Sequence, residues 1–417
     1  FTRRSVEELF WNAGLRVDAL GRIRVGERPE PRVTEALRRG RVFAPGLHDE
    51  GDVQQFTVVA RRPEPRAAPA PVAVVVLNWN QPEETLACLE ALDAQTHPDV
   101  TTWVVDNGSE DGSVERIRAA RPGIRVLETG RNRGYAGGNN VGLRAALEEG
   151  AELVVVLNND ARLAPDAIAR LAEAADRVPD AGVLGARILR AEAPGRIRCA
   201  GFRWSPRRGF VCVGRDEVDD GFDHRAIREE DAVMGCAMAL RARALRDVGL
   251  LDEDYFLQYE EIDWSWRARR RGWRTLFGGA AAAVHGEAVS CGGARAPLRA
   301  YFQERNRLLF ARRHLPAEEG RRLLRRAVRE LRDELLGPAG GGDAAPEGLR
   351  ARARSVRRRA RRPRLRARAR GLWDFLRGRT GDAPASVWRM QRAWQAWRAR
   401  ATATPEPASS PPSSPRA

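Results

Sequence analysis

The chain has 417 residues, 43% of them hydrophobic, which is enough for two or three domains with at least one sizeable core. The net charge is +16 and all 72 basic residues are arginine, which indicates a genome-level preference and weakens conclusions drawn from arginine content alone. No apolar run reaches the ~18 residues of a membrane span, no signal peptide is evident, and five dispersed cysteines favour free thiols over a disulfide framework or a zinc site. The first residue is Phe1 instead of Met, so we allow for a fragment.

Residues 1–62 read as a separate piece. The stretch "RSVEELFWNAGLRVDAL" has helical spacing of apolar residues up to a stop at Gly14, and "VQQFTVVARR" reads as a strand. This pattern resembles the closing segment of class I S-adenosylmethionine-dependent methyltransferases. The glycine-rich cofactor loop of that family is absent, so we assign no methyltransferase activity.

A Pro/Ala linker, "RRPEPRAAPAP", precedes an alternation of strands and helices. The expected strands lie within 72–80, 101–106, 124–130 and 151–160, and the expected helices follow at 82–95, 114–122 and after the glycine loop that begins at Gly134. Such alternation predicts a mainly parallel sheet with right-handed crossovers.

Three of these strands end in polar clusters. The clusters are Asn78–Trp79–Asn80, Asp106–Asn107–Gly108–Ser109 and Asn158–Asn159–Asp160. Ligands of open α/β sheets sit at the carboxyl ends of the strands, so we expect a site at this edge. Asp106 can accept a hydrogen bond from a pyrimidine imide, or it can cap the turn that "DNGS" forms. Asp160 either serves a ligand or ends a strand that turns at the surface.

The stretch "RNRGYAGGNN" holds three glycines that would let the backbone approach a ribose or a phosphate closely. It does not follow a strand in the register of a dinucleotide-binding loop, which excludes a nicotinamide site.

The ordered set of motifs resembles a family 2 glycosyltransferase of the GT-A fold, in the rhamnosyltransferase-like subgroup of surface polysaccharide assembly. The matching stretches are "VVVLNWNQPEETLACLEAL", "VVDNGSEDGS", "NRGYAGGNNVGL", "VVVLNNDARL", "MGCAMALRARALRDVGLLDEDYFLQYEEIDWSWRARRRGW" and "VHG". The resemblance covers about residues 72–315 and implies a nucleotide-sugar site. Its implied residues are Asn78, Asn80, Asp106, Asn107, Asn132, Gly134, Asn139 and Asn158.

In this family a short acidic triplet ends in the aspartate that binds a divalent cation. Here the triplet keeps only Asp160, so the resemblance implies Mg²⁺ or Mn²⁺ held by one carboxylate, by phosphate oxygens and by His285. His285 follows a strand of small residues, and its alternative role is that of a buried structural histidine.

The family's general base is the second acid of a pair, a position that Glu261 holds in "QYEEIDWSWRARRRGW". Asp263 is expected to orient this acidic stretch or to pair with an arginine. The alternative for these acids is ion pairing on a helix surface with Arg267 or Arg271. The two tryptophans of the stretch, Trp264 and Trp266, fit the core or the wall of an acceptor site.

The C-terminal third reads as helical. Residues 298–316 resemble the helix that follows the family's catalytic domain, and 320–336 carry an apolar stripe. The block 351–370 holds eleven arginines and no acid, which is typical of a solvated arm for nucleic acid or anionic lipid. The helix "SVWRMQRAWQAWRARA" suits an anionic membrane surface, or packs on the catalytic domain or a partner.

These observations predict five segments: the remnant 1–62, the linker 63–71, a GT-A domain at 72–315, a helical Arg-rich extension at 316–400 and a disordered tail at 401–417. The predicted function is inverting transfer of a sugar from a UDP- or dTDP-sugar to a saccharide or lipid-linked glycan. We expect a cytoplasmic enzyme, peripheral on the inner face of the plasma membrane. The alternative is a nucleic-acid-binding protein acting through the arginine block, but it leaves the strand-end clusters idle, so no specific nucleic acid is expected. A processive synthase is disfavoured because we find no membrane span and no Gln-x-x-Arg-Trp motif.

Overall fold

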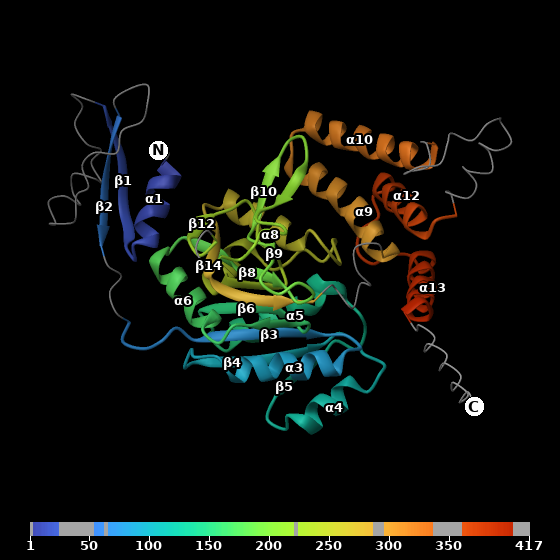
Figure 1. Ribbon diagram of the computed structural model, residues 1–417, viewed down its shortest axis with the longest axis horizontal. Coiled ribbons are helices and arrows are strands. Elements are labelled where there is room, and N and C mark those ends of the chain that lie inside the picture. The colour runs from blue at the N-terminus through green and yellow to red at the C-terminus, as the bar shows by residue number, and fades with distance from the viewer. Residues whose placement is uncertain are drawn as a thin grey trace, which may run out of the picture. The chain divides into compact units, whose positions relative to one another are not determined.

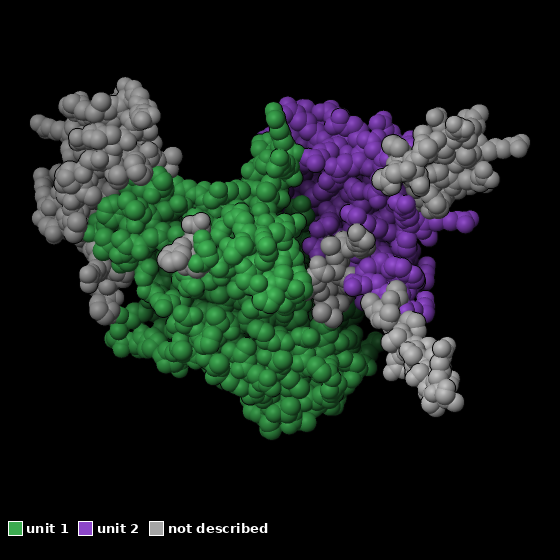
Figure 2. Space-filling model, viewed as in Figure 1, with its two compact units in different colours: residues 1–290 green, residues 291–417 purple. Residues whose placement is uncertain are grey.

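The structure is a computed structural model that describes residues 3–24, 54–61, 66–220, 224–286, 296–336 and 361–402. It divides into two compact units, residues 1–290 and 291–417, drawn in green and purple in Figure 2. The helix expected at 298–316 therefore groups with the C-terminal helices and not with the sheet. The domain boundaries given above remain predictions.

The first unit is built on a mixed sheet of ten strands, eight of them on a path ordered β12-β14-β8-β13-β6-β3-β4-β5 (Figure 1). Strands β3 to β6, β8 and β14 run in one direction, and β12 and β13 run opposite to them. The short strands β7 and β9 pair with β14 and β8. The expected mainly parallel sheet is therefore confirmed, with one reversed strand, β13, inside it.

The sheet strands are β3 (Val72–Asn78), β4 (Val100–Asp106), β5 (Arg125–Glu128), β6 (Leu153–Asn158), β7 (Ala161–Leu163), β8 (Ala181–Arg190), β9 (Ile197–Cys199), β12 (Ile227–Glu229), β13 (Ala237–Arg241) and β14 (Arg274–His285); β10 (Phe202–Ser205) and β11 (Gly209–Cys212) form a separate hairpin. The helices of this unit that flank the sheet are α3 (Pro82–Asp93), α4 (Ser113–Ala120), α5 (Gly134–Glu148), α6 (Ala167–Arg177), α7 (Ala242–Val248) and α8 (Glu260–Arg270).

Helices cover both faces of the sheet, which explains why its central strands are continuously apolar. Successive side chains of a strand point to opposite faces, so Val74 joins the core formed with α3, α4 and α6, whereas Val75 joins the core formed with α5, α7 and α8. Both valines are fully buried.

The N-terminal piece consists of α1 (Arg3–Asn12), which ends before Gly14, and the antiparallel strands β1 (Arg16–Arg24) and β2 (Gln54–Arg61). The helix with a stop at Gly14 and the strand at 54–61 are confirmed, whereas β1 was not expected. Asn12 exchanges two hydrogen bonds with the backbone of Ile227 in β12, at 3.0 and 2.7 Å. Helix α1 is therefore bound to the edge of the sheet.

The second unit contains α9 (Pro297–His314), α10 (Ala317–Leu336), α12 (Pro363–Leu376) and α13 (Ala385–Thr402). The second half of the arginine block folds as α12 instead of forming a solvated arm. Its Arg368 is bound by Glu304, Glu330 and Glu334 at 2.9, 3.3 and 2.6 Å. The rest of the block, 351–360, and the tail from 403 lie outside the described residues. Among the helices that the structure describes, none is long and apolar enough to cross a membrane.

Candidate functional site

The three polar strand ends meet at one edge of the sheet. The parallel register pairs Asn78 of β3 with Asp106 of β4, and Leu77 of β3 with Asn158 of β6. The chain leaves β3 towards β4 but leaves β6 in the other direction, so β3 and β6 flank a topological switch point, where open α/β sheets bind ligands.

Asn78 and Asp106 form a buried network. The Asn78 amide donates to Asp106 Oδ1 at 2.8 Å, and Thr85 Oγ1 donates to Asn78 Oδ1 at 2.7 Å. The other Asp106 oxygen accepts the backbone N–H of Ser109 at 3.0 Å. Asp106 therefore does cap the turn after β4, and its carboxylate is held in place by these donors.

Asn107 and Asn132 hold the segment that leads into α5. Asn107 Nδ2 donates to Asn132 Oδ1 at 3.2 Å and to the Gly134 carbonyl at 3.1 Å, while Asn132 Oδ1 also accepts the N–H of Gly134 at 2.8 Å. Asn80 has a left-handed backbone, with φ 53°, and its Oδ1 accepts the N–H of Glu110 at 2.8 Å. These side chains thus shape the loops of the strand-end edge, and their contact with a nucleotide stays a prediction.

The expected glycine loop is not a loop. Helix α5 begins at Gly134, and the three glycines lie within it. A Cβ on Gly134 would collide with the Phe256 carbonyl, and a Cβ on Gly138 would lie 2.5 Å from a Leu77 methyl. The glycines therefore allow close packing against protein atoms, and their approach to a ribose or a phosphate stays a prediction. Asn139, also in α5, is fully buried, and its Oδ1 has no partner among the described residues.

Asp160 and His285 lie together because of strand pairing. Strand β7 pairs with the end of β14 so that Ala161 faces His285, which brings His285 Nε2 within 3.1 Å of Asp160 Oδ1. The two side chains are 8% and 7% exposed. Two ligands of one cation, each about 2.1 Å from it and at right angles, lie about 3.0 Å apart. The pair is therefore spaced to occupy two neighbouring coordination positions of one divalent cation.

The remaining members of the triplet contribute little to such a centre. Asn158 Nδ2 is 3.4 Å from His285 Nε2, and Asn159 turns towards α3 and donates to Thr85 Oγ1 at 3.1 Å. In the parts of the chain that are described, no group of three or more His, Cys, Asp or Glu side chains gathers in a geometry for metal.

The acidic pair begins α8. Three residues before it have left-handed backbones, with φ of 63° at Phe256, 69° at Gln258 and 78° at Tyr259. Such conformations cost about 1–3 kcal/mol each and cluster at functional sites. They turn the chain so that the first residues of α8, Glu260 and Glu261, point into the protein and not to solvent.

Burial dominates the chemistry of both glutamates. Desolvation raises the pKa of Glu261 from 4.5 to about 7, although hydrogen bonds from backbone N–H groups oppose the rise. Desolvation, with the neighbouring charge of Glu261, raises the pKa of Glu260 well above its usual range. One oxygen of each carboxyl group is buried without a partner among the described side chains. At neutral pH Glu260 therefore keeps its proton, and Glu261 is the group that ionises first.

Two residues that the sequence reading missed connect the halves of the site. Cys236 stands just before β13, and because β13 is reversed, its start lies at the edge where β6 ends. Burial is the largest cause that raises the pKa of the Cys236 thiol, and the charges of Asp160 and Glu261 raise it further. Tyr135 donates to the Gly235 carbonyl at 2.5 Å, and its pKa is raised by burial and then by Glu260 and Glu261. Asp160 and Glu261 therefore lie within electrostatic reach of one thiol. The sequence signal that could have pointed to Tyr135 is its position as a large side chain within a run of small residues.

Asp263 and Trp264 hold α8 in place. Asp263 accepts from Arg267 at 2.7 Å, which is the pairing with an arginine expected for it, but the carboxylate is 1% exposed and does not lie on a helix surface. Arg267 also donates to the carbonyls of Val248 and Leu250, so the pair anchors α8 to the loop after α7. Trp264 is buried and donates to the Gly249 carbonyl at 2.8 Å. A catalytic part for Asp263 stays a prediction.

Comparison with known proteins gives consistent matches. Residues 73–235 match the family model described as Glycosyl transferase family 2. The chain is 28% identical over 264 residues to the N-acetylglucosaminyl-diphospho-decaprenol L-rhamnosyltransferase of Mycobacterium tuberculosis (strain H37Rv), covering 58% of this chain and 84% of that protein. It is 26% identical over 239 residues to the low-salt glycan biosynthesis hexosyltransferase Agl10 of Haloferax volcanii, covering 57% and 74%.

Among solved structures, the mannosyltransferase PcManGT from Pyrobaculum calidifontis in complex with GDP-Man and Mn²⁺ superposes with a TM-score of 0.41 and 18% identity, over 88% of this chain and 86% of that chain. The family match and the mixed, mainly parallel sheet confirm the expected α/β fold of the GT-A type with a helical C-terminal region.

Proposed function

We propose that this chain, which carries a family 2 glycosyltransferase domain in residues 73–235, moves a sugar from a nucleotide-diphosphate donor to an acceptor hydroxyl with inversion. Glycosyl transfer in glycan synthesis follows from the family match and from the named relatives. One arrangement supports the finer proposal. Asp160 is paired with His285, and both Asp160 and Glu261 raise the pKa of the Cys236 thiol, which stands at the edge of the sheet where β6 ends.

The donor would bind across the ends of β3 and β4. Asp106 offers carboxylate oxygens held by Asn78 and Ser109, and such an acceptor fits the imide N–H of uracil or thymine. From the resemblance we also assign binding of the nucleotide sugar to Asn78, Asn80, Asn107, Asn132, Gly134, Asn139 and Asn158.

Asp160 and His285 would hold Mg²⁺ or Mn²⁺. Their separation of 3.1 Å and the small number of protein ligands both fit a cation that also takes oxygens from a diphosphate. Such an ion, when bound, offsets the negative charge that grows on a departing diphosphate.

Glu261 is our candidate general base. It takes the acceptor's proton as the acceptor oxygen attacks the anomeric carbon from the face opposite the leaving diphosphate, and this single displacement inverts the centre by the same logic as in inverting hydrolases. A base is most effective when its pKa lies near the working pH, which burial of Glu261 provides. Glu260, whose pKa is higher, keeps its proton and can donate a hydrogen bond.

The acceptor proposal rests on the relatives. The mycobacterial protein is named for a diphospho-decaprenol acceptor, so we propose a lipid-linked glycan or a free saccharide here. Exposed apolar side chains lie on the Arg-rich helices α12 and α13, with Trp373 49%, Leu376 56% and Trp397 59% exposed. They support peripheral binding of a cytoplasmic enzyme to an anionic membrane face.

We also propose, from the resemblance alone, that residues 1–62 are the end of a methyltransferase domain.

A donor screen tests this function. UDP- and dTDP-sugars are incubated with the full chain and a saccharide or polyprenyl-diphosphate acceptor, with Mn²⁺ or with EDTA. We expect nucleoside diphosphate release that needs the cation, and a product whose anomeric configuration, read by NMR, is opposite to that of the donor. Retained configuration would contradict the role of Glu261, and failure of every donor would contradict the transferase itself.

A further inference from the structure

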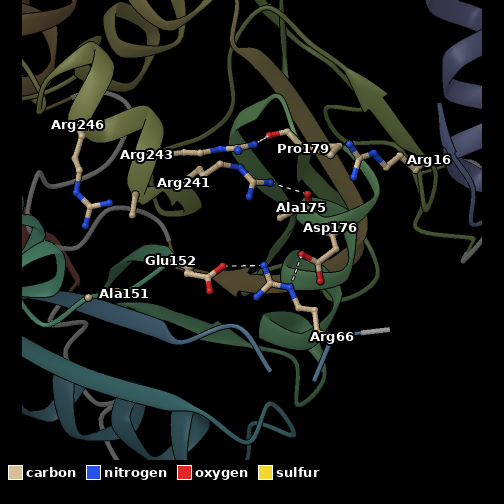
Figure 3. Close-up of a pocket in the computed structure, with 12 residues that line it drawn as sticks. Arg16, Arg66, Ala151, Glu152, Ala175, Asp176, Pro179, Arg241, Arg243 and Arg246 are labelled. Carbon is tan, nitrogen blue, oxygen red and sulfur yellow. Dashed lines mark hydrogen bonds and ion pairs between the residues drawn. The ribbon is translucent and has the colours of Figure 1, made fainter. Parts of the chain in front are cut away.

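A basic pocket of about 390 Å³ lies at the edge of the sheet opposite to the candidate catalytic site. Its guanidinium groups come from β1, the linker, the end of β13 and α7 (Figure 3). They belong to Arg16, Arg66, Arg241, Arg243 and Arg246. Strand β13 separates this pocket from Cys236, and its five residues span roughly 17 Å at 3.3 Å per residue. The pocket is thus distinct from the strand ends that hold Asp160.

The positive charge of the pocket is only partly balanced. Two carboxylates line it, Glu152 and Asp176, and both are bound to Arg66, at 2.7 and 3.1 Å. Among the lining residues that the structure describes, five arginines thus face two acids, and both acids are engaged by Arg66. Within the described ranges, Arg241, Arg243 and Arg246 form no ion pair with a carboxylate; they donate to backbone carbonyls.

The unbalanced positive charge disfavours the charged form of Arg241. It donates through Nε to the Ala181 carbonyl at 2.8 Å and through Nη2 to the Ala175 carbonyl at 2.6 Å, so part of its role is to cap the end of α6. These bonds leave its Nη1 without an acceptor in the described part of the chain. Burial, and then the like charges of Arg243 and Arg66, lower the pKa of Arg241 to about 10. An anion in the pocket would relieve both effects.

We propose that this pocket binds a phosphate-bearing anion. Guanidinium groups match the oxygens of phosphate in geometry and charge, and pockets of this size hold small ligands. Arg241, fixed by two carbonyls, presents Nη1, and the exposed Arg243 and Arg246 of α7 line the same pocket. The ligand is a free phosphate compound or the headgroup of an anionic lipid.

The test uses the full chain and two probes. Calorimetry with sodium pyrophosphate measures the free anion, and co-sedimentation with phosphatidylglycerol vesicles, against phosphatidylcholine vesicles, measures the lipid. EDTA is present so that cation-dependent binding at Asp160 does not contribute. The pocket variant is Arg243→Ser with Arg246→Ser, because these side chains are exposed. The control is Arg116→Ser with Arg118→Ser, two exposed arginines of α4 that remove the same charge outside the pocket.

We expect saturable binding of one probe to the unaltered protein, weakened at least tenfold in the pocket variant and less than twofold in the control. Which probe binds identifies the source of the phosphate. Binding of neither probe, or equal weakening in both double variants, overturns the proposal. Pyrophosphate binding that survives unchanged in the pocket variant also overturns it, since the anion would then occupy another site.

Discussion

Replacing Glu261 by glutamine should make the protein less active and more stable. Glu261 as a whole residue is half-buried, but one oxygen of its carboxylate is buried and has no partner among the described residues. Its pKa is 4.5 in an ordinary environment and about 7 in the fold. The folded protein therefore disfavours the charged form, and glutamine keeps the shape of the side chain without that charge.

The magnitude follows from linkage. Moving a pKa from 4.5 to about 7 corresponds to about 3 kcal/mol. Below pH 4.5 both the folded and the unfolded chain keep the proton, so Glu261→Gln should change the free energy of unfolding little. Between pH 4.5 and about 7 the unfolded chain releases this proton while the folded chain keeps it, and above pH 7 the folded chain must bury the charge. The variant should then be more stable by about 3 kcal/mol at pH 8.

Urea unfolding at several pH values between 4.5 and 8 measures this difference, with EDTA present and no donor. Glu115→Gln serves as the control, because Glu115 is an exposed acid of α4 and its loss should give no comparable gain. Sugar transfer at pH 7.5 is measured on the same samples, and loss of a general base should lower kcat by about 10²–10⁴-fold. A stability difference that does not change with pH, or a variant that is less stable at pH 8, would refute the reasoning.

Three further predictions concern the same edge of the sheet. The kcat/KM of the unaltered protein should fall about tenfold per pH unit below about 7, as Glu261 takes up a proton; a pH–rate profile without this limb contradicts the assignment. Asp160→Asn should raise the Mn²⁺ concentration needed for half-maximal transfer at least tenfold, because it removes the carboxylate 3.1 Å from His285, and an unchanged metal titration would count against the cation site. Gly134→Ala should lower the free energy of unfolding by more than about 2 kcal/mol, whereas Gly150→Ala, equally left-handed but with no atom within 4 Å, should cost only its backbone strain; equal losses in urea unfolding would remove the packing argument.

The parallel core of the fold could be predicted from the sequence because its signals are local. Runs such as Val72–Leu77 are long enough for a strand and are apolar at every position, and the polar residues that follow them mark the strand ends. Since parallel strands share an edge, the meeting of Asn78 with Asp106 followed directly from that pattern.

The second half of the site depends on contacts between distant segments, which local patterns do not specify. His285 reaches Asp160 through a three-residue strand, β7, whose pairing with β14 has no local signature. The reversed insertion of β13 brings Cys236 to the site by the same kind of long-range pairing. The resemblance supplied the choice of His285 and Glu261, and residue spacing alone did not.

The glycines of α5 show that a permissive residue has more than one possible purpose. Glycine allows either a close approach of a ligand or a close approach of the protein, and sequence alone does not distinguish the two. Here Gly134 makes room for the backbone of Phe256, the first left-handed residue of the loop that leads to the acidic pair. Likewise, the composition of the arginine block predicted a solvated arm, whereas its Arg368 is bound by three glutamates of other helices.

The reversed direction of β13 constrains how this protein can change. One tip of the strand adjoins Cys236 and the other ends in Arg241, so an inserted or deleted residue would shift one tip against its surroundings while the other stayed in register. Variation in length should consequently accumulate in the loops on either side of β13. The strand itself should keep its length, because it fixes the distance between the acidic strand-end site and the arginine-lined pocket.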